Sequence, residues 1–207
     1  MPSFNFNKII KTLIVTDMII YSSWGLVAPI FAVFILNSIK GGDASVVGIA
    51  TGIYWVTKSI LQIPLGKYLD RNHGEKDDHR LMVAGTFMAS LIPIGFLISS
   101  QIWHIYVLQF IYAIAMAMVI PSWGGIFTRH IDKGREAETW GFESSSLGLG
   151  VGIAGIIGGF VAKSSGFAPL FILVSVFGIL GSFLLLVIRK DISPKDGKVM
   201  PIRRALK

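Results

Sequence analysis

Two charged residues, Asp17 and Lys58, lie well inside long apolar stretches of the 207-residue sequence. If those stretches are membrane helices, each charge costs about 2.5–3.5 kcal/mol at a helix centre, so neither side chain should face lipid. At about 1.5 Å per residue, Asp17 lies roughly 9 Å beyond Lys11, and Lys58 lies about 12 Å before Gly66. Both charges then have a similar depth from one membrane face, and adjacent antiparallel helices could hold them as a pair.

Polar and aromatic residues recur at helical spacing on the same faces as the two charges. The candidate set comprises both charges and these neighbours: Asp17, Tyr21, Trp24, Tyr54, Lys58, Gln62, Gln109 and Tyr112. We expect the set to line a polar cavity in which Asp17 or Lys58 couples to protons or binds a charged substrate. The alternative is a structural ion pair, or a Lys58 side chain that extends to the membrane surface.

The composition is typical of an integral membrane protein. Hydrophobic residues make up 53% of the sequence and charged residues 15%, whereas an ordinary soluble domain has about 25% charged residues. A helix needs roughly 20 apolar residues to cross the hydrocarbon core, and six stretches reach that length: 12–36, 46–65, 81–99, 103–127, 144–162 and 167–188. None alternates polar and apolar residues as a barrel strand does. We expect an all-α, polytopic membrane protein with six transmembrane helices within residues 1–190 and a basic tail at 191–207.

Lysines and arginines gather on one side of this six-helix plan. Sixteen of the nineteen precede the first stretch or follow the second, fourth and sixth, whereas Lys40 and Lys163 lie on the other side. Cytoplasmic loops are enriched in such residues, so we expect a multi-pass protein of the plasma membrane with both termini in the cytoplasm. This placement explains the net charge of +7 without a nucleic-acid partner and leaves membrane lipid as a partner.

Enzyme chemistry is not indicated. All four histidines lie in loops or at the ends of the stretches, and no two are spaced at i and i+4 for a metal site. A six-helix intramembrane serine protease needs a histidine in a later helix, and the sixth stretch has none. We therefore expect no catalytic residues, no metal and no cofactor.

A glycine and an acidic residue four positions later follow the second stretch. This segment resembles the signature loop between the second and third helices of the major facilitator superfamily, in which glycine, aspartate and arginine precede a second glycine and a basic pair. Gly66, Asp70 and Arg71 match, and Gly74 comes one residue late. Acidic residues stand where bases are expected: Glu75, Asp77 and Asp78. The resemblance implies a gating loop that contains Gly66, Asp70, Arg71 and Gly74.

Glycines dominate the fifth stretch. Four of them recur at helical spacing and should form one smooth face for close helix packing: Gly148, Gly152, Gly155 and Gly159. Gly150, Ala154 and Gly158 widen that face. The stretch resembles a glycine–proline motif that is associated with antiporters of the superfamily, although it lacks the proline.

The fourth stretch departs from one branch of the superfamily. Drug–proton antiporters carry an arginine twelve residues before a proline at the end of this helix, and Gln109 occupies that position here. Proton-coupled drug efflux is therefore not expected.

Over all six stretches, the sequence resembles the N-terminal half of a major facilitator transporter. The halves of such a transporter are related by an axis along the membrane normal, so six helices enclose a central cavity only with a second copy or another six-helix half. The resemblance implies alternating-access transport of an unidentified small solute, and we expect a homodimer. In a parallel homodimer, Asp70 could face the N-terminus of the partner's fifth helix at residues 140–144. The alternative function is a non-transporting membrane scaffold that docks partners on the charged loop at 129–138.

Overall fold

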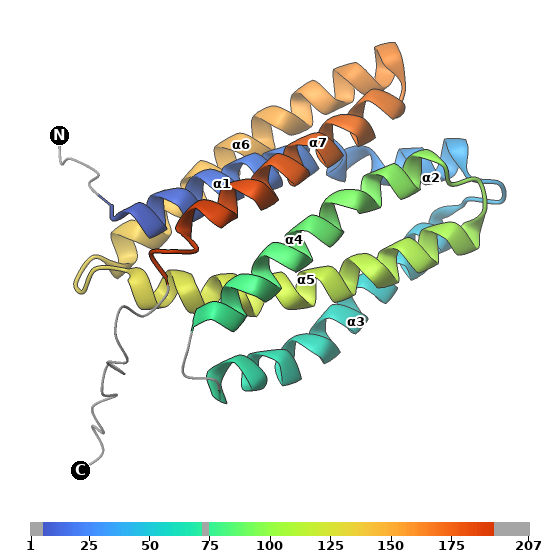
Figure 1. Ribbon diagram of the computed structural model, residues 1–207. Coiled ribbons are helices and arrows are strands. Elements are labelled where there is room, and N and C mark those ends of the chain that lie inside the picture. Colours follow the sequence, from blue (N-terminus) through green and yellow to red (C-terminus); the bar gives the residue numbers. More distant parts are fainter. Residues whose placement is uncertain (1–5, 72–74, 193–207) are drawn as a thin grey trace.

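The computed structural model describes residues 6–71 and 75–192, and the regular elements of that part are helices. The long ones are α1 (Lys8–Gly25), α3 (Ala44–Arg71), α4 (Glu75–Leu97), α5 (Ile102–His130), α6 (Glu136–Ser165) and α7 (Ala168–Leu184). Short elements extend two of the spans: η1 (Ala28–Ile30) and α2 (Phe31–Ser38) follow α1, and η2 (Leu185–Ile188) follows α7. Six helical segments are long and apolar enough to cross a membrane, which confirms the predicted all-α, six-helix fold (Figure 1).

The first predicted span, 12–36, is a broken helix. Pro29 has no N–H to donate to the carbonyl of Gly25, where α1 ends, so the α-helical bonding pattern is interrupted there. The chain passes through the 3-10 turn η1 and resumes as α2. The first span is therefore two helical segments joined by a short turn.

The helices form an open arc. Neighbours in space run in the order α3, α5, α4, α7, α1 and α6, and Figure 1 shows α3 and α6 on opposite sides of the bundle. Only 17% of the apolar window of α3 and 11% of that of α6 is buried, against 33–44% for the other four spans. The outer faces of α3 and α6 are therefore edges that the described chain leaves uncovered.

Two apolar clusters hold the arc together, one toward each end. Phe34, Phe96 and Phe171 pack tilted or edge-on with ring centroids 4.8–6.3 Å apart in the first cluster. The second contains Leu13 and Phe127, both fully buried. Along α1, the segment between these clusters carries the candidate site.

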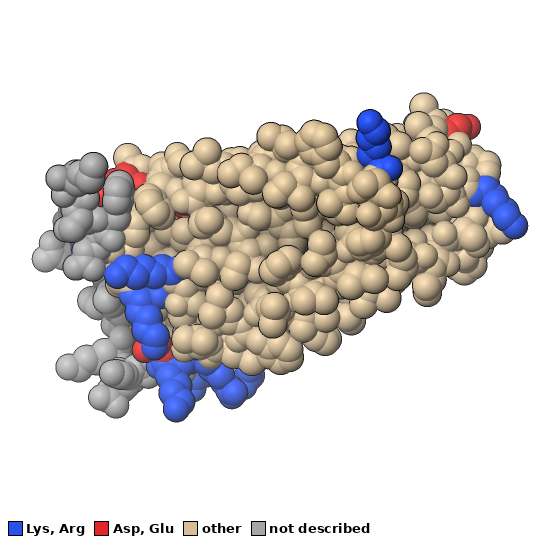
Figure 2. Space-filling view, turned by 90° about the horizontal axis from the view of Figure 1, so that it is seen from above, with Lys and Arg blue, Asp and Glu red and all other residues tan. Residues whose placement is uncertain are grey.

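Basic side chains gather at one end of the molecule. Figure 2 shows lysines and arginines concentrated at one end of the face in view, with only scattered charges toward the other end. Lys8 at the start of α1 pairs with Asp191 after η2 at 2.7 Å, so the first and last described helices meet at this end. The distribution agrees with the predicted six-span plan.

The glycine-rich helix α6 packs against α1 mainly through the residues that widen the predicted face, rather than through its four central glycines. Three of the four predicted packing glycines have open space where a Cβ atom would stand: Gly148, Gly152 and Gly159. Only Gly155 of that set touches α1, with 3.6 Å between its Cβ position and the Gly25 carbonyl oxygen. The closest contact is at Gly158, where a Cβ would overlap the Leu26 backbone. Three of the four glycines therefore leave an open face on α6, because a helix this rich in glycine has more than one smooth face and spacing alone does not say which one meets α1.

Replacing Gly158 with valine is expected to disrupt the contact of α6 with α1, because the new side chain meets backbone that cannot move aside cheaply. Overpacking of this kind costs about 1–3 kcal/mol. Gly159→Val is the matched control, since a Cβ there meets nothing within 4 Å. In a detergent that keeps the chain monomeric, thermal unfolding of Gly158→Val should shift down by roughly 2–10 °C and that of the control should not. Equal shifts would contradict this packing.

Candidate functional site

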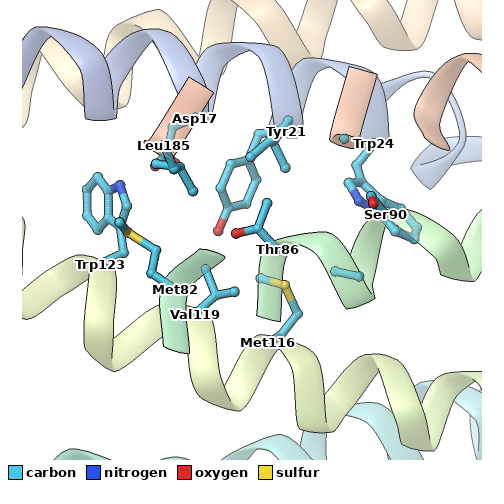
Figure 3. Close-up of a pocket in the computed structure, with 13 residues that line it drawn as sticks. Asp17, Tyr21, Trp24, Met82, Thr86, Ser90, Met116, Val119, Trp123 and Leu185 are labelled. Carbon is cyan, nitrogen blue, oxygen red and sulfur yellow. The ribbon is translucent and has the colours of Figure 1, made fainter. Parts of the chain in front are cut away.

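Asp17 of α1 lies in the interior of the bundle, with 8% of its surface exposed. It lines a small cavity with side chains of α1, α4 and α5 (Figure 3), among them Tyr21, Trp24, Met82, Thr86, Ser90, Met116 and Trp123. The cavity measures about 20 Å³, which is room for roughly one water molecule. A solute does not fit within this chain in this conformation, so a substrate-sized cavity requires either a movement of the helices or further protein opposite them.

Polar groups face the cavity from three helices. Figure 3 shows the hydroxyl groups of Tyr21 and Thr86 pointing toward each other from α1 and α4. The indole Nε1 of Trp123 on α5 is buried, and within residues 6–71 and 75–192 it has no hydrogen-bond partner. Leaving a buried donor unsatisfied costs about 1–3 kcal/mol. The surroundings of Asp17 therefore have spare hydrogen-bonding capacity.

A second buried carboxylate, that of Glu143 on α6, is a site residue that sequence analysis missed. The residue is 6% exposed and lies within electrostatic range of Asp17, on a helix that packs against α1. The predicted span began at residue 144, but α6 begins at Glu136, so Glu143 lies about two turns inside the helix. Within the described residues, neither carboxylate has an ion-pair or hydrogen-bond partner. Two neighbouring acids without a cation can bind and release a proton.

Lys58 is also buried, with 6% exposure, but it does not pair with Asp17. Its ammonium lies 3.6 Å from the centroid of the Trp55 ring and 5.1 Å from that of Tyr54, which is a cation–π arrangement. The ion pair that the sequence left open as an alternative does not form, because α3 packs against α5, whereas α1 packs against α6 and α7. A similar depth in the membrane did not make the two helices neighbours. Among the described residues, Lys58 has no acidic partner.

The predicted aromatic residues meet in one stack across three helices. Trp24 of α1 stacks on Tyr112 of α5 with centroids 4.6 Å apart, and Tyr112 stacks on Tyr54 of α3 at 5.0 Å. Trp24 also lines the Asp17 cavity, and Tyr54 is in contact with Lys58. The stack therefore connects the acidic cavity to the buried lysine.

The two predicted glutamines flank this stack. Gln109 is buried on α5, three residues before Tyr112, and Gln62 is half-buried on α3, four residues after Lys58. The structure thus arranges the predicted set as a cavity on α1 and a cationic segment on α3, joined by aromatic rings, rather than as one pocket.

Most of the predicted gating loop is helical. Gly66, Asp70 and Arg71 belong to the last two turns of α3, and Gly74 lies outside the described residues. The side chains of Asp70 and Arg71 are exposed. The residues that match the superfamily's loop motif are therefore held on a rigid helix end.

The predicted helix N-terminus at residues 140–144 is wrong. α6 begins at Glu136 and carries Glu136 and Glu138 in its first turn, so residues 140–144 lie inside the helix with their N–H groups already used. Two acids at the true N-terminus would repel Asp70 rather than attract it. The suggested contact of Asp70 with this helix end in a partner is therefore not supported.

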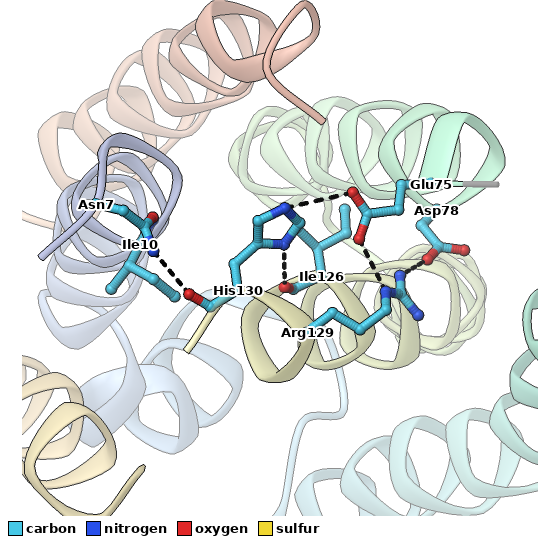
Figure 4. Close-up of polar contacts among 7 residues, drawn as sticks. All are labelled: Asn7, Ile10, Glu75, Asp78, Ile126, Arg129 and His130. Carbon is cyan, nitrogen blue, oxygen red and sulfur yellow. Dashed lines mark hydrogen bonds and ion pairs between the residues drawn. The ribbon is translucent and has the colours of Figure 1, made fainter. Parts of the chain in front are cut away.

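An ion-pair network joins the helix ends at the basic end of the bundle (Figure 4). Arg129, in the last turn of α5, donates from Nε to Glu75 at 2.9 Å and from Nη2 to the buried Asp78. His130 Nε2 lies 3.5 Å from the second Glu75 oxygen, and Asn7 donates to the His130 carbonyl at 2.7 Å. Two of the acids that stand where the superfamily motif has bases, Glu75 and Asp78, therefore have their basic partner on α5. The network links α1, α4 and α5.

Comparison with known proteins places this architecture in a family. The family model described as Major Facilitator Superfamily matches residues 13–205. The chain belongs to this superfamily. An uncharacterized MFS-type transporter of Methanocaldococcus jannaschii is 27% identical over 168 residues, which are 81% of this chain and 42% of the relative. The proton-coupled antiporter flippase LtaA of Staphylococcus saprophyticus is 24% identical over 105 residues, which are 51% of this chain and 26% of that protein. The chain spans less than half the length of these curated superfamily members.

Asp78→Asn should weaken the network of this superfamily member, because Asp78 is buried and Arg129 would lose one of its two charged acceptors. The expected loss in unfolding free energy is about 1–3 kcal/mol, measured by thermal unfolding. Asp132→Asn is the control, since Asp132 is exposed and its contact with Arg135 is long, at 4.0 Å. A control variant that is as unstable as Asp78→Asn would argue against a structural role of this network.

Proposed function

We propose that this chain is a six-helix unit of a major facilitator transporter that moves a small solute by alternating access. The observation that carries the proposal is the buried Asp17 carboxylate, which lines a cavity beside polar side chains and a second acid. A charge costs about 2.5–3.5 kcal/mol at the centre of a membrane helix. A purely structural charge would be paired, and within the described residues Asp17 is not.

A second six-helix unit would complete the cavity. The edge helices α3 and α6 carry small residues with open space where a Cβ would stand: Gly48, Gly52, Gly148, Gly152 and Gly159. Small residues let membrane helices approach closely, so these faces suit another helical unit. The greater length of the relatives supports a larger assembly around the matched segment. We propose that the second unit is another copy of this chain and that α3 and α6 form the homodimer interface.

The separated charges give the proposed cavity two functions. Asp17 and Glu143 exchange a proton with the solution, and Lys58 binds a negatively charged group of the solute. The stack of Trp24, Tyr112 and Tyr54 between them offers a flat apolar surface. The likeness to a proton-coupled antiporter flippase agrees with proton coupling in this chain.

The proposed orientation follows from the basic end of the bundle. Lysine and arginine are enriched in cytoplasmic loops, and sixteen of the nineteen belong to this end in the six-span plan. We place the protein in the plasma membrane with both termini in the cytoplasm, where the network around Arg129 also lies.

A non-transporting scaffold is the rival function. Its predicted docking loop, 129–138, uses most of its charges within the chain, because Arg135 pairs with Glu138 at 2.9 Å and Arg129 pairs with α4. This internal pairing favours a connector over a docking surface. An intact scaffold predicts no solute flux in vesicles, whereas a transporter predicts flux.

Asp17→Asn and Lys58→Met should each reduce uptake by reconstituted protein at least tenfold, and Asp17→Asn and Glu143→Gln should flatten its pH dependence. The readout is a screen of small solutes in proteoliposomes with an imposed pH gradient. Asp43→Asn is the control: Asp43 lies outside the spans, and the Ser45 hydroxyl and Val46 N–H hold the pKa of its carboxyl below its usual value. Unchanged flux and pH dependence in Asp17→Asn and Lys58→Met would overturn the cavity's role.

Gly152→Trp should weaken the homodimer, because the new ring occupies the space that a second copy needs on α6. In mild detergent, light scattering should give twice the chain mass of 22.6 kDa, and the substitution should raise the dissociation constant at least tenfold. Leu180→Trp, at an exposed position of α7, should leave it unchanged. A chain that is monomeric at all concentrations, or that copurifies with a different six-helix protein, would rule out the homodimer.

A further inference from the structure

A groove of about 420 Å³ runs between α4 and α7 at the basic end of the bundle. It lies away from the Asp17 cavity, with which it shares no lining residue. Its base is fixed, because the buried His79 ring contacts the Leu185 carbonyl with 2.8 Å between Nε2 and the oxygen. A ring nitrogen next to a carbonyl donates, so this bond joins α4 to η2 at the base of the groove.

Two arginines stand at the mouth of the groove without acidic partners. Arg80 of α4 and Arg189 after η2 both line it and are both exposed, and within residues 6–71 and 75–192 neither forms an ion pair. Two nearby acids are already in use, since Asp78 is paired with Arg129 and Asp191 with Lys8. Two guanidinium groups at one opening form a positive site that matches the oxygens of a phosphate.

The wall that α4 contributes changes from charged to apolar with depth. Val83, Ala84 and Phe87 follow Arg80 at i+3, i+4 and i+7, so they lie on the same helix face. At about 1.5 Å per residue, Phe87 is roughly 10 Å deeper in the membrane than Arg80. The groove therefore has a cation at the membrane surface and hydrocarbon below it.

The opposite wall of the groove, formed by α7 and η2, also changes from charged to apolar with depth. Leu186 and Phe183 precede Arg189 by three and six residues, and both line the groove with exposed side chains. A ligand that fits both walls has an anionic group at one end and a long apolar part behind it. Basic pockets between membrane helices recognise lipid headgroups of this kind.

We propose that this groove is a binding site for an anionic phospholipid. The phosphate lies between Arg80 and Arg189, and an acyl chain lies against Phe87 and Phe183. The bound lipid bridges α4 and α7. The proposal rests on the groove and its charges alone, so it stands or falls independently of transport.

The charge arm of the test compares two phospholipids with identical acyl chains. Native mass spectrometry of the full chain in detergent should show phosphatidylglycerol binding at least tenfold more tightly than phosphatidylcholine. Arg80→Gln with Arg189→Gln should remove this preference. Lys67→Gln with Lys76→Gln removes the same charge from exposed positions outside the groove and should preserve it. Equal losses in both double variants would show diffuse attraction to the basic end and overturn the site.

The second part of the test changes the shape of the groove and leaves Arg80 and Arg189 in place. Ala84→Trp fills the groove and should lower phosphatidylglycerol binding at least tenfold, whereas Ala137→Trp, at an exposed position outside the groove on α6, should not. Glycerol phosphate at millimolar concentration should fail to displace the lipid. Displacement by glycerol phosphate together with full binding by Ala84→Trp would mean a site for free phosphate and would overturn the proposal. Because Ala84→Trp leaves the charges intact, this arm decides the matter even if the arginine variant does not fold.

Discussion

The cost of holding charge inside a hydrocarbon layer is the constraint on which this bundle depends. Asp17 and Lys58 would each cost about 2.5–3.5 kcal/mol at a helix centre facing lipid, and both are nearly fully buried. The helix order keeps them apart: Asp17 lies within electrostatic range of Glu143 on α6, which packs against α1, and Lys58 lies over the Trp55 ring on α3. A pair would have neutralised both charges. Separated, the acids and the lysine are each available to a ligand.

The open arc follows from where the helices can approach one another. α1 reaches α6 closely because Gly158 has no side chain next to the Leu26 backbone, and Pro29 ends the α-helical pattern just beyond that contact. With α6 held at one end of the row and α3 at the other, the outer faces of both helices stay uncovered. The helix order that buries the charges also leaves the proposed cavity open on one side. For this reason we propose that a second unit completes it.

The sequence predicts well where the membrane-spanning helices lie, but it predicts poorly which helices pack against one another. The six apolar segments and the positions of the basic residues between them are local properties of the sequence. The six helices of the structure therefore agree with them. Which charge lies near Asp17 depends on the order of the helices, which no spacing encodes, so a similar depth in the membrane did not determine whether Lys58 is its neighbour. Glu143 itself was lost because a span boundary read from hydropathy stopped one residue short of it. The contact of α6 with α1 falls at Gly158, on the edge of the predicted glycine face, because the position of the neighbouring helix and not the glycine spacing decides which glycines are covered.

The most direct test of the account is access to the cavity from both sides of the membrane. The sequence contains no cysteine, so Ser90→Cys places a single thiol in the wall of the Asp17 cavity at almost constant volume. In proteoliposomes, a small membrane-impermeant thiol reagent should modify this cysteine when added to either side, whereas Ser164→Cys, exposed near the end of α6, should react from one side only. Reaction of Ser90→Cys from a single side, or from neither, under every pH gradient would contradict alternating access at this site.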